Sequence, residues 1–364
     1  MLEEGDIALT RYKRISVSIC LTAVFLICVF LLLRNTGASS EYSSDQFLMD
    51  TMVSIKVYGS DQEKLKLAVT DAYAEMRRIA ELADGFAQPD TAAFGSSDVC
   101  RINSHAGKQP VKVDGDTMAM LLLAKKYCQL SGGAFDVTIG PVMDLWGFGG
   151  KNPQVPAPDR IKAALALVRD QDLVLNEKDG TVLLRREGMK LDLGAVAKGY
   201  ATEKALQVLK QHAVEKALID AGGNIRVLGR NPHDAPWRIG IKDPRKSSGV
   251  VAALPLEDAS DVTSADYYRG FEEGGKRYHH ILDPRTGYPA GHAMTVTVVT
   301  QDAGLADVLS TVFFVLPPEK ALQMAEQMPG VELFLVTADR RIFHTPGLRS
   351  KVEIKPGAGY RLAE

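Results

Sequence analysis

Hydrophobic and polar positions alternate in short runs over most of this chain, and the spacing of each run predicts its secondary structure. Residues 52–58 alternate between apolar and polar side chains, which predicts a β-strand. Residues 61–81 carry apolar side chains at helical spacing, and Asp61 is placed to cap that helix. Further helices are predicted at residues 116–130, 158–168, 195–211 and 303–315. Further strands are predicted at residues 172–175, 181–184, 189–191, 217–219, 224–228, 237–241, 333–337 and 341–344.

The order of these elements indicates the fold class. The predicted strands come in runs and do not alternate strictly with helices, so the pattern favours an α+β fold with a largely antiparallel sheet. No internal repeat or low-complexity tract is present.

Residues 15–33 form a run of nineteen uncharged positions in which three hydroxyl side chains interrupt the apolar ones. A helix of this length, rising about 1.5 Å per residue, can cross a hydrocarbon core of about 30 Å. Basic residues at positions 11, 13 and 14 predict that residues 1–14 stay in the cytoplasm. We therefore expect a single-pass membrane anchor, with everything after Arg34 across the membrane from the cytoplasm. A cleaved signal peptide, with a weak cleavage site at residues 36–38, is the alternative.

Composition excludes several classes of protein. The chain has 364 residues, 46% of them hydrophobic, so it can bury a large core and is not a disordered protein. Its 43 basic and 45 acidic residues give a net charge of −2, which argues against nucleic-acid binding. Two of its four cysteines, Cys100 and Cys128, lie beyond the apolar segment. They form either one disulfide or two independent core thiols, and their spacing does not match a zinc site.

The sequence LDLGAVAKGYA at residues 191–201 reads as a strand, a glycine turn and the start of a helix. A helix N-terminus offers unpaired N–H groups and partial positive charge to an anion, and Lys198 lies one turn inside it. The segment matches neither the dinucleotide-binding glycine pattern nor a P-loop. A tight connection with Asp192 as a helix cap is the purely structural alternative.

The helix predicted at residues 303–315 contains an aspartate among apolar residues. Asp307 is costly there unless its charge has a partner, and Thr311 lies four residues on, on the same helix face. A carboxylate and a hydroxyl, completed by carbonyl, water or phosphate oxygens, suit Mg²⁺. The alternative is a buried aspartate paired with a backbone N–H or a lysine.

Two adjacent histidines precede a turn at residues 283–287. Strand geometry sends His279 and His280 to opposite faces, so one of them can enter a given site. Such a histidine can accept a proton near neutral pH. A surface histidine pair beside the turn is the alternative.

Together, and in this order, these segments resemble the ApbE family of FAD:protein FMN transferases. The matching stretches are MDT at 49–51, SDVCRINSHAG at 97–107, GGAFDVTIGPVMDLWGFG at 132–149, LDLGAVAKGYA at 191–201, LIDAGGNIRVLG at 218–229, TSADY at 263–267, HHILDPRTGYP at 279–289 and LADVLST at 305–311. The resemblance runs from about residue 47 to residue 337.

The resemblance implies an activity and a set of site residues. Family members cleave FAD in the presence of Mg²⁺ and attach FMN to a Thr or Ser hydroxyl of a target protein, releasing AMP. The positions that match family FAD contacts are Met49, Ala134, Phe135, Asp136, Asp192, Lys198 and Ile281. The positions that match metal ligands are Ala195, through its carbonyl, Asp307 and Thr311. His280 matches the proposed proton acceptor, with Asp283 as an alternative, and TSADYYRGF at 263–271 departs from the commoner TSGDYERYF.

From these observations we expect a single two-lobed transferase domain at residues 47–345, after a membrane helix at 15–33 and a linker at 34–46, with a tail at 346–364. The expected partners are FAD, Mg²⁺, the membrane and an acceptor protein with a Thr or Ser site, such as a membrane-bound or exported redox subunit. A Mg²⁺-dependent FAD diphosphatase that releases free FMN and AMP is the alternative enzyme. A non-catalytic, membrane-tethered flavin-binding protein is the alternative from another class.

Overall fold

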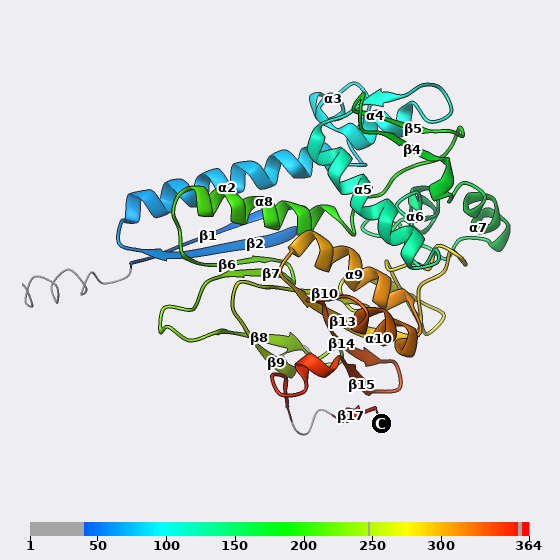
Figure 1. The fold of residues 1–364 in the computed structure, drawn as a ribbon. Helices are drawn as coiled ribbons and strands as arrows, with labels where there is room; N and C mark the ends of the chain where they lie inside the picture. Colours follow the sequence, from blue (N-terminus) through cyan, green and yellow to red (C-terminus); the bar gives the residue numbers. More distant parts are fainter. Residues whose placement is uncertain (1–39, 151, 247, 356–358, 364) are drawn as a thin grey trace, which may run out of the picture.

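The computed structural model describes residues 40–150, 152–246, 248–355 and 359–363. The predicted membrane helix at 15–33 lies outside these residues, and no helix within them is both long enough and apolar enough to span a membrane. The described chain is an α+β fold with a mostly antiparallel sheet, as predicted, and it forms two lobes (Figure 1).

A nine-stranded sheet forms the larger lobe, in the order β1-β2-β6-β7-β10-β13-β14-β15-β17. All neighbours in it are antiparallel except the pair β15 and β17. Its strands are β1 (Ser40–Leu48), β2 (Thr51–Gly59), β6 (Lys216–Ala221), β7 (Asn224–Leu228), β10 (Ser260–Ala265), β13 (Ala293–Thr300), β14 (Glu332–Thr337), β15 (Arg341–His344) and β17 (Arg361–Leu362).

Helices cover one face of this sheet and a small sheet lies at the other (Figure 1). The covering helices are α2 (Gln62–Ala83), α8 (Ala197–Gln211), α9 (Ala303–Val315) and α10 (Pro318–Glu326). The small sheet contains β8 (Trp237–Lys242), β9 (Val250–Leu256) and β16 (Glu353–Ile354). The main core fills the space between the helices and the sheet, and a second core lies between the sheet and β8–β9. The sheet is therefore buried on both faces, which positions its strand ends rigidly.

The smaller lobe is built from helices and a three-stranded sheet in the order β3-β5-β4. Its elements are α3 (Ala92–Ser96), α4 (Asp98–Ser104), β3 (Val111–Lys112), α5 (Gly115–Leu130), α6 (Gly140–Trp146), α7 (Pro158–Leu165), a 3-10 helix η1 (Asp170–Asp172), β4 (Leu173–Asn176) and β5 (Thr181–Leu184). A separate hairpin consists of β11 (Gly270–Glu273) and β12 (Lys276–His279). Cys100 and Cys128 are buried free thiols, so the described structure contains no disulfide between them.

Most predicted helices and strands are confirmed, and α9 and β15 have the predicted bounds. The capping role predicted for Asp61 is also confirmed, because its side chain accepts a hydrogen bond from the N–H of Lys64. The strand predicted at residues 189–191 is wrong, since only Lys190 makes a β-bridge, to Ile139.

Both predicted boundaries of the domain need correction. Residues 40–46 belong to strand β1 and not to a linker, because β1 pairs with β2 over its whole length. Its polar composition reads as a linker because β1 is an edge strand with alternate residues exposed. Residues 346–364 are not a simple tail either, since they contain a 3-10 helix η2 (Pro346–Leu348) and the strands β16 and β17, which pair with β9 and β15.

Candidate active site

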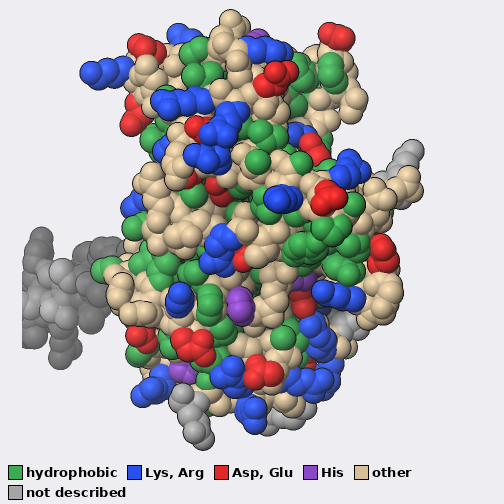
Figure 2. Space-filling model, turned by 90° about the vertical axis from the view of Figure 1, so that its right-hand side faces the viewer, with side chains coloured by type: hydrophobic (Ala, Val, Ile, Leu, Met, Phe, Trp, Pro, Cys, Tyr) green, Lys and Arg blue, Asp and Glu red, His purple; other side chains and the backbone are tan. Residues whose placement is uncertain are grey.

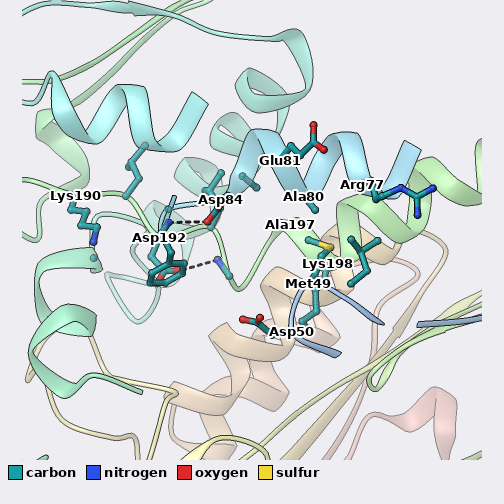
Figure 3. A pocket seen from close by; sticks show the side chains of 18 of the residues that line it. Met49, Asp50, Arg77, Ala80, Glu81, Asp84, Lys190, Asp192, Ala197 and Lys198 are labelled. Carbon is teal, nitrogen blue, oxygen red and sulfur yellow. Dashed lines mark hydrogen bonds between the residues drawn. The ribbon is translucent and has the colours of Figure 1, made fainter. Parts of the chain in front are cut away.

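A cavity opens where the two lobes meet the ends of the large sheet. Its inner part, the inner cavity, has a volume of about 330 Å³, and its outer part, the outer cavity, about 600 Å³. The two parts share seven lining residues and are therefore continuous: Met49, Asp50, Phe86, Asp192, Gly194, Lys198 and Arg269. Figure 3 shows the outer cavity, with Asp192 and Lys198 on opposite sides of the opening.

The eleven residues that the sequence proposed for FAD, metal and proton acceptance line the inner cavity, whereas Asp283, the alternative proton acceptor, does not. The eleven are Met49, Ala134, Phe135, Asp136, Asp192, Ala195, Lys198, His280, Ile281, Asp307 and Thr311. They come from the β1–β2 hairpin, the smaller lobe, the start of α8, the segment after β12, and α9. The fold thus brings together residues that are far apart in the sequence.

The turn between β1 and β2 holds Met49 at the junction of the two cavities. Met49 and Asp50 have positive φ angles of 53° and 57°, as a two-residue hairpin turn that follows the sheet's twist requires. Neither residue is a glycine, so each costs about 1–3 kcal/mol of local strain. Thr51 packs on the turn after β6, where a Cβ added to Gly222 would lie 2.1 Å from the threonine hydroxyl oxygen. This close packing fixes the hairpin tip at the cavity.

Helices α8 and α9 meet beside the inner cavity through a glycine and an aspartate. The N–H of Gly199 donates to Oδ2 of Asp307 over 2.8 Å. A Cβ on Gly199 would lie 2.1 Å from the carbonyl oxygen of Ala303, so only glycine allows this approach. Lys198 Nζ lies 3.9 Å from the other carboxylate oxygen of Asp307. The partners proposed for a purely structural aspartate are both present, and the same aspartate also lines the cavity.

The start of α8 differs slightly from the prediction. The helix begins at Ala197 and its N-cap is Val196, so Ala195 lies in the preceding turn. Asp192 does not cap the helix; its Oδ1 accepts the N–H of Gly194 over 2.7 Å. Burial raises the pKa of Asp192, although the hydrogen bond from Gly194 acts in the opposite direction.

Asp136 sits in the wall formed by the smaller lobe. Its Oδ1 accepts hydrogen bonds from the backbone N–H of Thr138, over 2.8 Å, and from the Thr138 hydroxyl, over 2.7 Å. Burial raises the pKa of Asp136, because the charged form loses hydration. Ala134, Phe135 and Ile281 add buried apolar surface around it. This wall suits a flat, mostly apolar group that needs a few polar contacts.

The two adjacent histidines point in different directions, as predicted. His279 is buried, with Nε2 2.9 Å from the carbonyl oxygen of Ala290. His280 lines the inner cavity, and its Nδ1 lies 3.2 Å from the carbonyl oxygen of Arg269. Burial lowers the pKa of His280 to about 4, so its imidazole is neutral at neutral pH and can accept a proton. Asp283, the alternative acceptor, is held by a bidentate ion pair with Arg285.

Three neighbouring oxygen donors can be tested for their fit to a metal ion. Asp307, Thr311 and Ala195 all line the inner cavity and offer a carboxylate, a hydroxyl and a carbonyl. Oδ1 of Asp307 lies 3.9 Å from the Lys198 ammonium, so this oxygen is oriented toward positive charge. A set of hard oxygen donors of this kind fits Mg²⁺, with substrate and water oxygens completing the coordination.

Some cavity residues were not predicted from the sequence. Phe86 is 70% exposed and lines both parts of the cavity, but nothing in its sequence context distinguishes it from a core residue. Arg269 lines both parts as well, and its guanidinium lies 3.5 Å from the carboxylate of Asp50. This ion pair joins segments more than two hundred positions apart, so no local pattern could reveal it.

Basic and acidic side chains are mixed on the face drawn in Figure 2, and no uniformly basic area gathers there. This distribution agrees with the net charge of −2. Within the cavity, Lys198 and the start of α8 are local groups that can bind an anionic ligand.

Comparison with known proteins places these features in a family. The ApbE family model matches residues 49–335. An FAD:protein FMN transferase of Klebsiella pneumoniae is 36% identical over 303 residues, covering 83% of this chain and 90% of that protein. One of Treponema pallidum is 33% identical over 347 residues, covering 90% and 94%. The crystal structure of an ApbE protein from Thermotoga maritima superposes with a TM-score of 0.78 at 33% identity, covering 86% of this chain and 99% of the other. This chain therefore belongs to the ApbE family.

Proposed function

We propose that this protein is a Mg²⁺-dependent FAD:protein FMN transferase that links FMN to a Thr or Ser hydroxyl of an acceptor protein. The observation that carries the proposal is the meeting of a buried aspartate that faces a lysine ammonium, a helix N-terminus and a neutral histidine in one cavity. The names of its relatives in Klebsiella and Treponema support the same activity.

The cavity residues divide the work of binding FAD. Phe135 and Ile281 provide apolar contact for the ring systems, and Asp136 and Asp192 provide hydrogen-bond acceptors. Lys198 and the start of α8 lie where positive charge can bind the diphosphate. Ala195, Asp307 and Thr311 would hold Mg²⁺, which supplies charge neutralisation at the diphosphate when bound.

The transfer forms one bond and breaks one. The acceptor hydroxyl oxygen attacks the phosphorus of the FMN half of FAD, and the bond from that phosphorus to the bridging oxygen breaks. AMP leaves with the bridging oxygen, and His280 takes the hydroxyl proton. Its lowered pKa keeps the imidazole unprotonated at neutral pH, although it also makes His280 a weak base. Its orientation by the Arg269 carbonyl therefore matters as much as its basicity.

The decisive experiment separates transfer from hydrolysis. The full-length protein in detergent is mixed with FAD, Mg²⁺ and an acceptor protein. The acceptor is a protein that the related flavin transferase of Vibrio cholerae modifies. We expect a fluorescent flavin band on the acceptor in a denaturing gel, with AMP released in equal amount. AMP release without a labelled acceptor would replace the transferase with the FAD diphosphatase. Flavin binding without AMP release would leave only the non-catalytic flavin-binding protein.

We also propose that residues 15–33 anchor the protein in a bacterial inner membrane, with the catalytic domain on the periplasmic side. The support is the uncharged run and the basic residues before it. Strand β1 begins at Ser40, so the domain would start close to the membrane surface. A periplasmic reporter fused after Arg34 should be active, and an inactive reporter would reverse the orientation.

A further inference from the structure

The hairpin β11–β12 leads directly to the cavity and has a free edge. It forms a two-stranded sheet of its own, and no other described strand pairs with it. Arg269 precedes β11 and His280 follows β12, and both line the inner cavity. The N–H of His280 donates to the carbonyl oxygen of Arg269 over 3.1 Å. The base of the hairpin is therefore the wall of the cavity.

The register determines which backbone groups of β11 point outward. Gly274 and Gly275, with φ angles of 60° and 73°, form a two-residue turn between the strands. Hydrogen-bonded and non-bonded pairs alternate along an antiparallel ladder. Since Arg269 and His280 form a bonded pair, the N–H and C=O groups of Gly270 and Glu272 point away from β12. Both residues are exposed.

Aromatic packing holds this edge in a fixed place. Phe271 and Tyr278 stack on each other, with ring centroids 5.6 Å apart. Both lie against Trp146 of α6, at 6.3 Å and 5.4 Å between centroids. Trp146 is fully buried, and its Nε1–H donates to the carbonyl oxygen of Gly287 over 2.8 Å. An isolated hairpin is marginally stable, so this anchoring preorganises an edge that would otherwise fluctuate.

We propose that the edge of β11 binds an extended segment of the acceptor protein as an added β-strand and guides its hydroxyl group toward His280. The inference rests on the proposed transfer function, which requires a protein segment to enter the cavity beside His280. A free strand edge binds an extended chain through its backbone. The four residues of β11 span roughly 13 Å at 3.3 Å per residue and end at Arg269, at the cavity.

The location of the hairpin favours a polypeptide over a small molecule. The hairpin packs on Trp146 of α6, and most of its residues are exposed, so a second protein can approach it. A Cβ at Gly270 would lie 2.5 Å from the carbonyl oxygen of Tyr278 on β12, so glycine is required there and only backbone is present at the end of the strand nearest the cavity. Gly270 and Glu272 therefore offer mainly backbone groups at this edge. The edge would recognise the extended backbone of the acceptor segment more than its side chains.

The test variant removes one outward N–H of β11. A control variant accounts for the carboxylate that is lost at the same time. Glu272→Pro deletes that N–H without removing a hydrogen bond of the ladder, because the N–H points away from β12. Glu272→Ala is the matched control, which removes the carboxylate and keeps the N–H. We expect the KM for the acceptor to rise at least tenfold in Glu272→Pro and to stay within twofold in Glu272→Ala. The Kd for FAD, measured by flavin fluorescence, should be unchanged in both variants.

A second probe tests the same contact on the unmodified protein. An acceptor peptide with an N-methyl group on the backbone beside its threonine should compete with the acceptor protein at least tenfold more weakly than the unmethylated peptide. Equal KM values for the two Glu272 variants, or equal competition by the two peptides, would overturn the strand-addition proposal. If the unmodified protein labels no acceptor at all, it is the proposed transferase function that fails.

Discussion

Asp307 on α9 and Asp261 on β10 are almost equally buried, with 4% and 2% of their surfaces exposed, but they have opposite environments. Oδ2 of Asp307 accepts the N–H of Gly199, and its other oxygen faces Lys198. Oδ2 of Asp261 has no hydrogen-bond partner among the described residues. The difference teaches that burial alone does not identify a functional carboxylate, since the partners decide whether it can carry charge.

The neighbours of Asp261 explain the contrast. Burial, and then the negative charge of Asp220, raise the pKa of Asp261 to about 7. Asp220 uses its own Oδ1 to accept the N–H of Gly223 over 3.0 Å. Asp261 therefore accepts a proton in place of a cation near neutral pH, and it does not line the cavity. Asp307 has the donors that a buried anion needs, and it lies where a ligand can reach it.

The largest expected effect follows from removing the charge of Asp307. Asp307→Asn keeps an oxygen that can accept the N–H of Gly199, so the fold should survive, but it removes the carboxylate proposed to bind Mg²⁺. We expect the rate of flavin transfer to fall by at least about 10²–10³-fold, as when a charge-stabilising group is lost from an active site. The rate is measured from in-gel flavin fluorescence at saturating FAD and Mg²⁺.

The matched control for that variant is Asp261→Asn. It changes an equally buried aspartate into the same amide, and it should leave the transfer rate within about twofold because Asp261 is not at the cavity. Similar losses in both variants would mean that the effect of Asp307→Asn reflects the fold and not the site.

The sequence alone identified Asp307 as a candidate functional residue but gave no information about Asp261. Asp307 stood out because helical spacing places it with Thr311 on one face of an otherwise apolar helix. Asp261 lies in β10, a strand that the pattern of residues did not predict, as was also true of β9 and β13. These strands are buried on both faces and lack the simple alternation that reveals a half-exposed strand.

Long-range packing also hid part of the site. The resemblance placed the individual site residues in one cavity, but neither Phe86 nor the ion pair between Asp50 and Arg269 has a local signature. Strands β1 and β17 also lack a local signature in the sequence. Their polar segments form strands because a neighbouring strand pairs with their backbone groups.

An intermediate effect is expected from the glycine that gives Asp307 its hydrogen bond. In Gly199→Ala the new Cβ would meet the carbonyl oxygen of Ala303 at 2.1 Å and Cβ of Asp307 at 2.6 Å. Overpacking of this kind lowers the free energy of unfolding by about 1–3 kcal/mol, partly offset by the better helix propensity of alanine. Urea unfolding measures it. Gly115→Ala, at the start of α5, meets no atom within 4 Å and should not destabilise the protein.

The smallest expected effect is a gain in stability from Asp261→Asn that depends on pH. An aspartate has a pKa of about 3.9 when unfolded, whereas that of Asp261 in the folded protein is about 7. Between these values the folded state binds more protons, so the contribution of Asp261 to stability falls as the pH rises. The variant lacks this loss, but its buried amide has an unmet hydrogen bond of its own, which offsets part of the gain. We therefore expect the variant to be more stable by about 1 kcal/mol at pH 8.

Urea unfolding at pH 4.5, 6 and 8 tests this dependence on pH. The difference between Asp261→Asn and the parent protein should grow from pH 4.5 to pH 6 and again to pH 8, because Asp261 in the folded state loses its proton only around its pKa of about 7. A constant difference at all three pH values would show that Asp261 ionises normally in the folded protein. In that case an undetected partner stabilises its charge, and the contrast with Asp307 disappears.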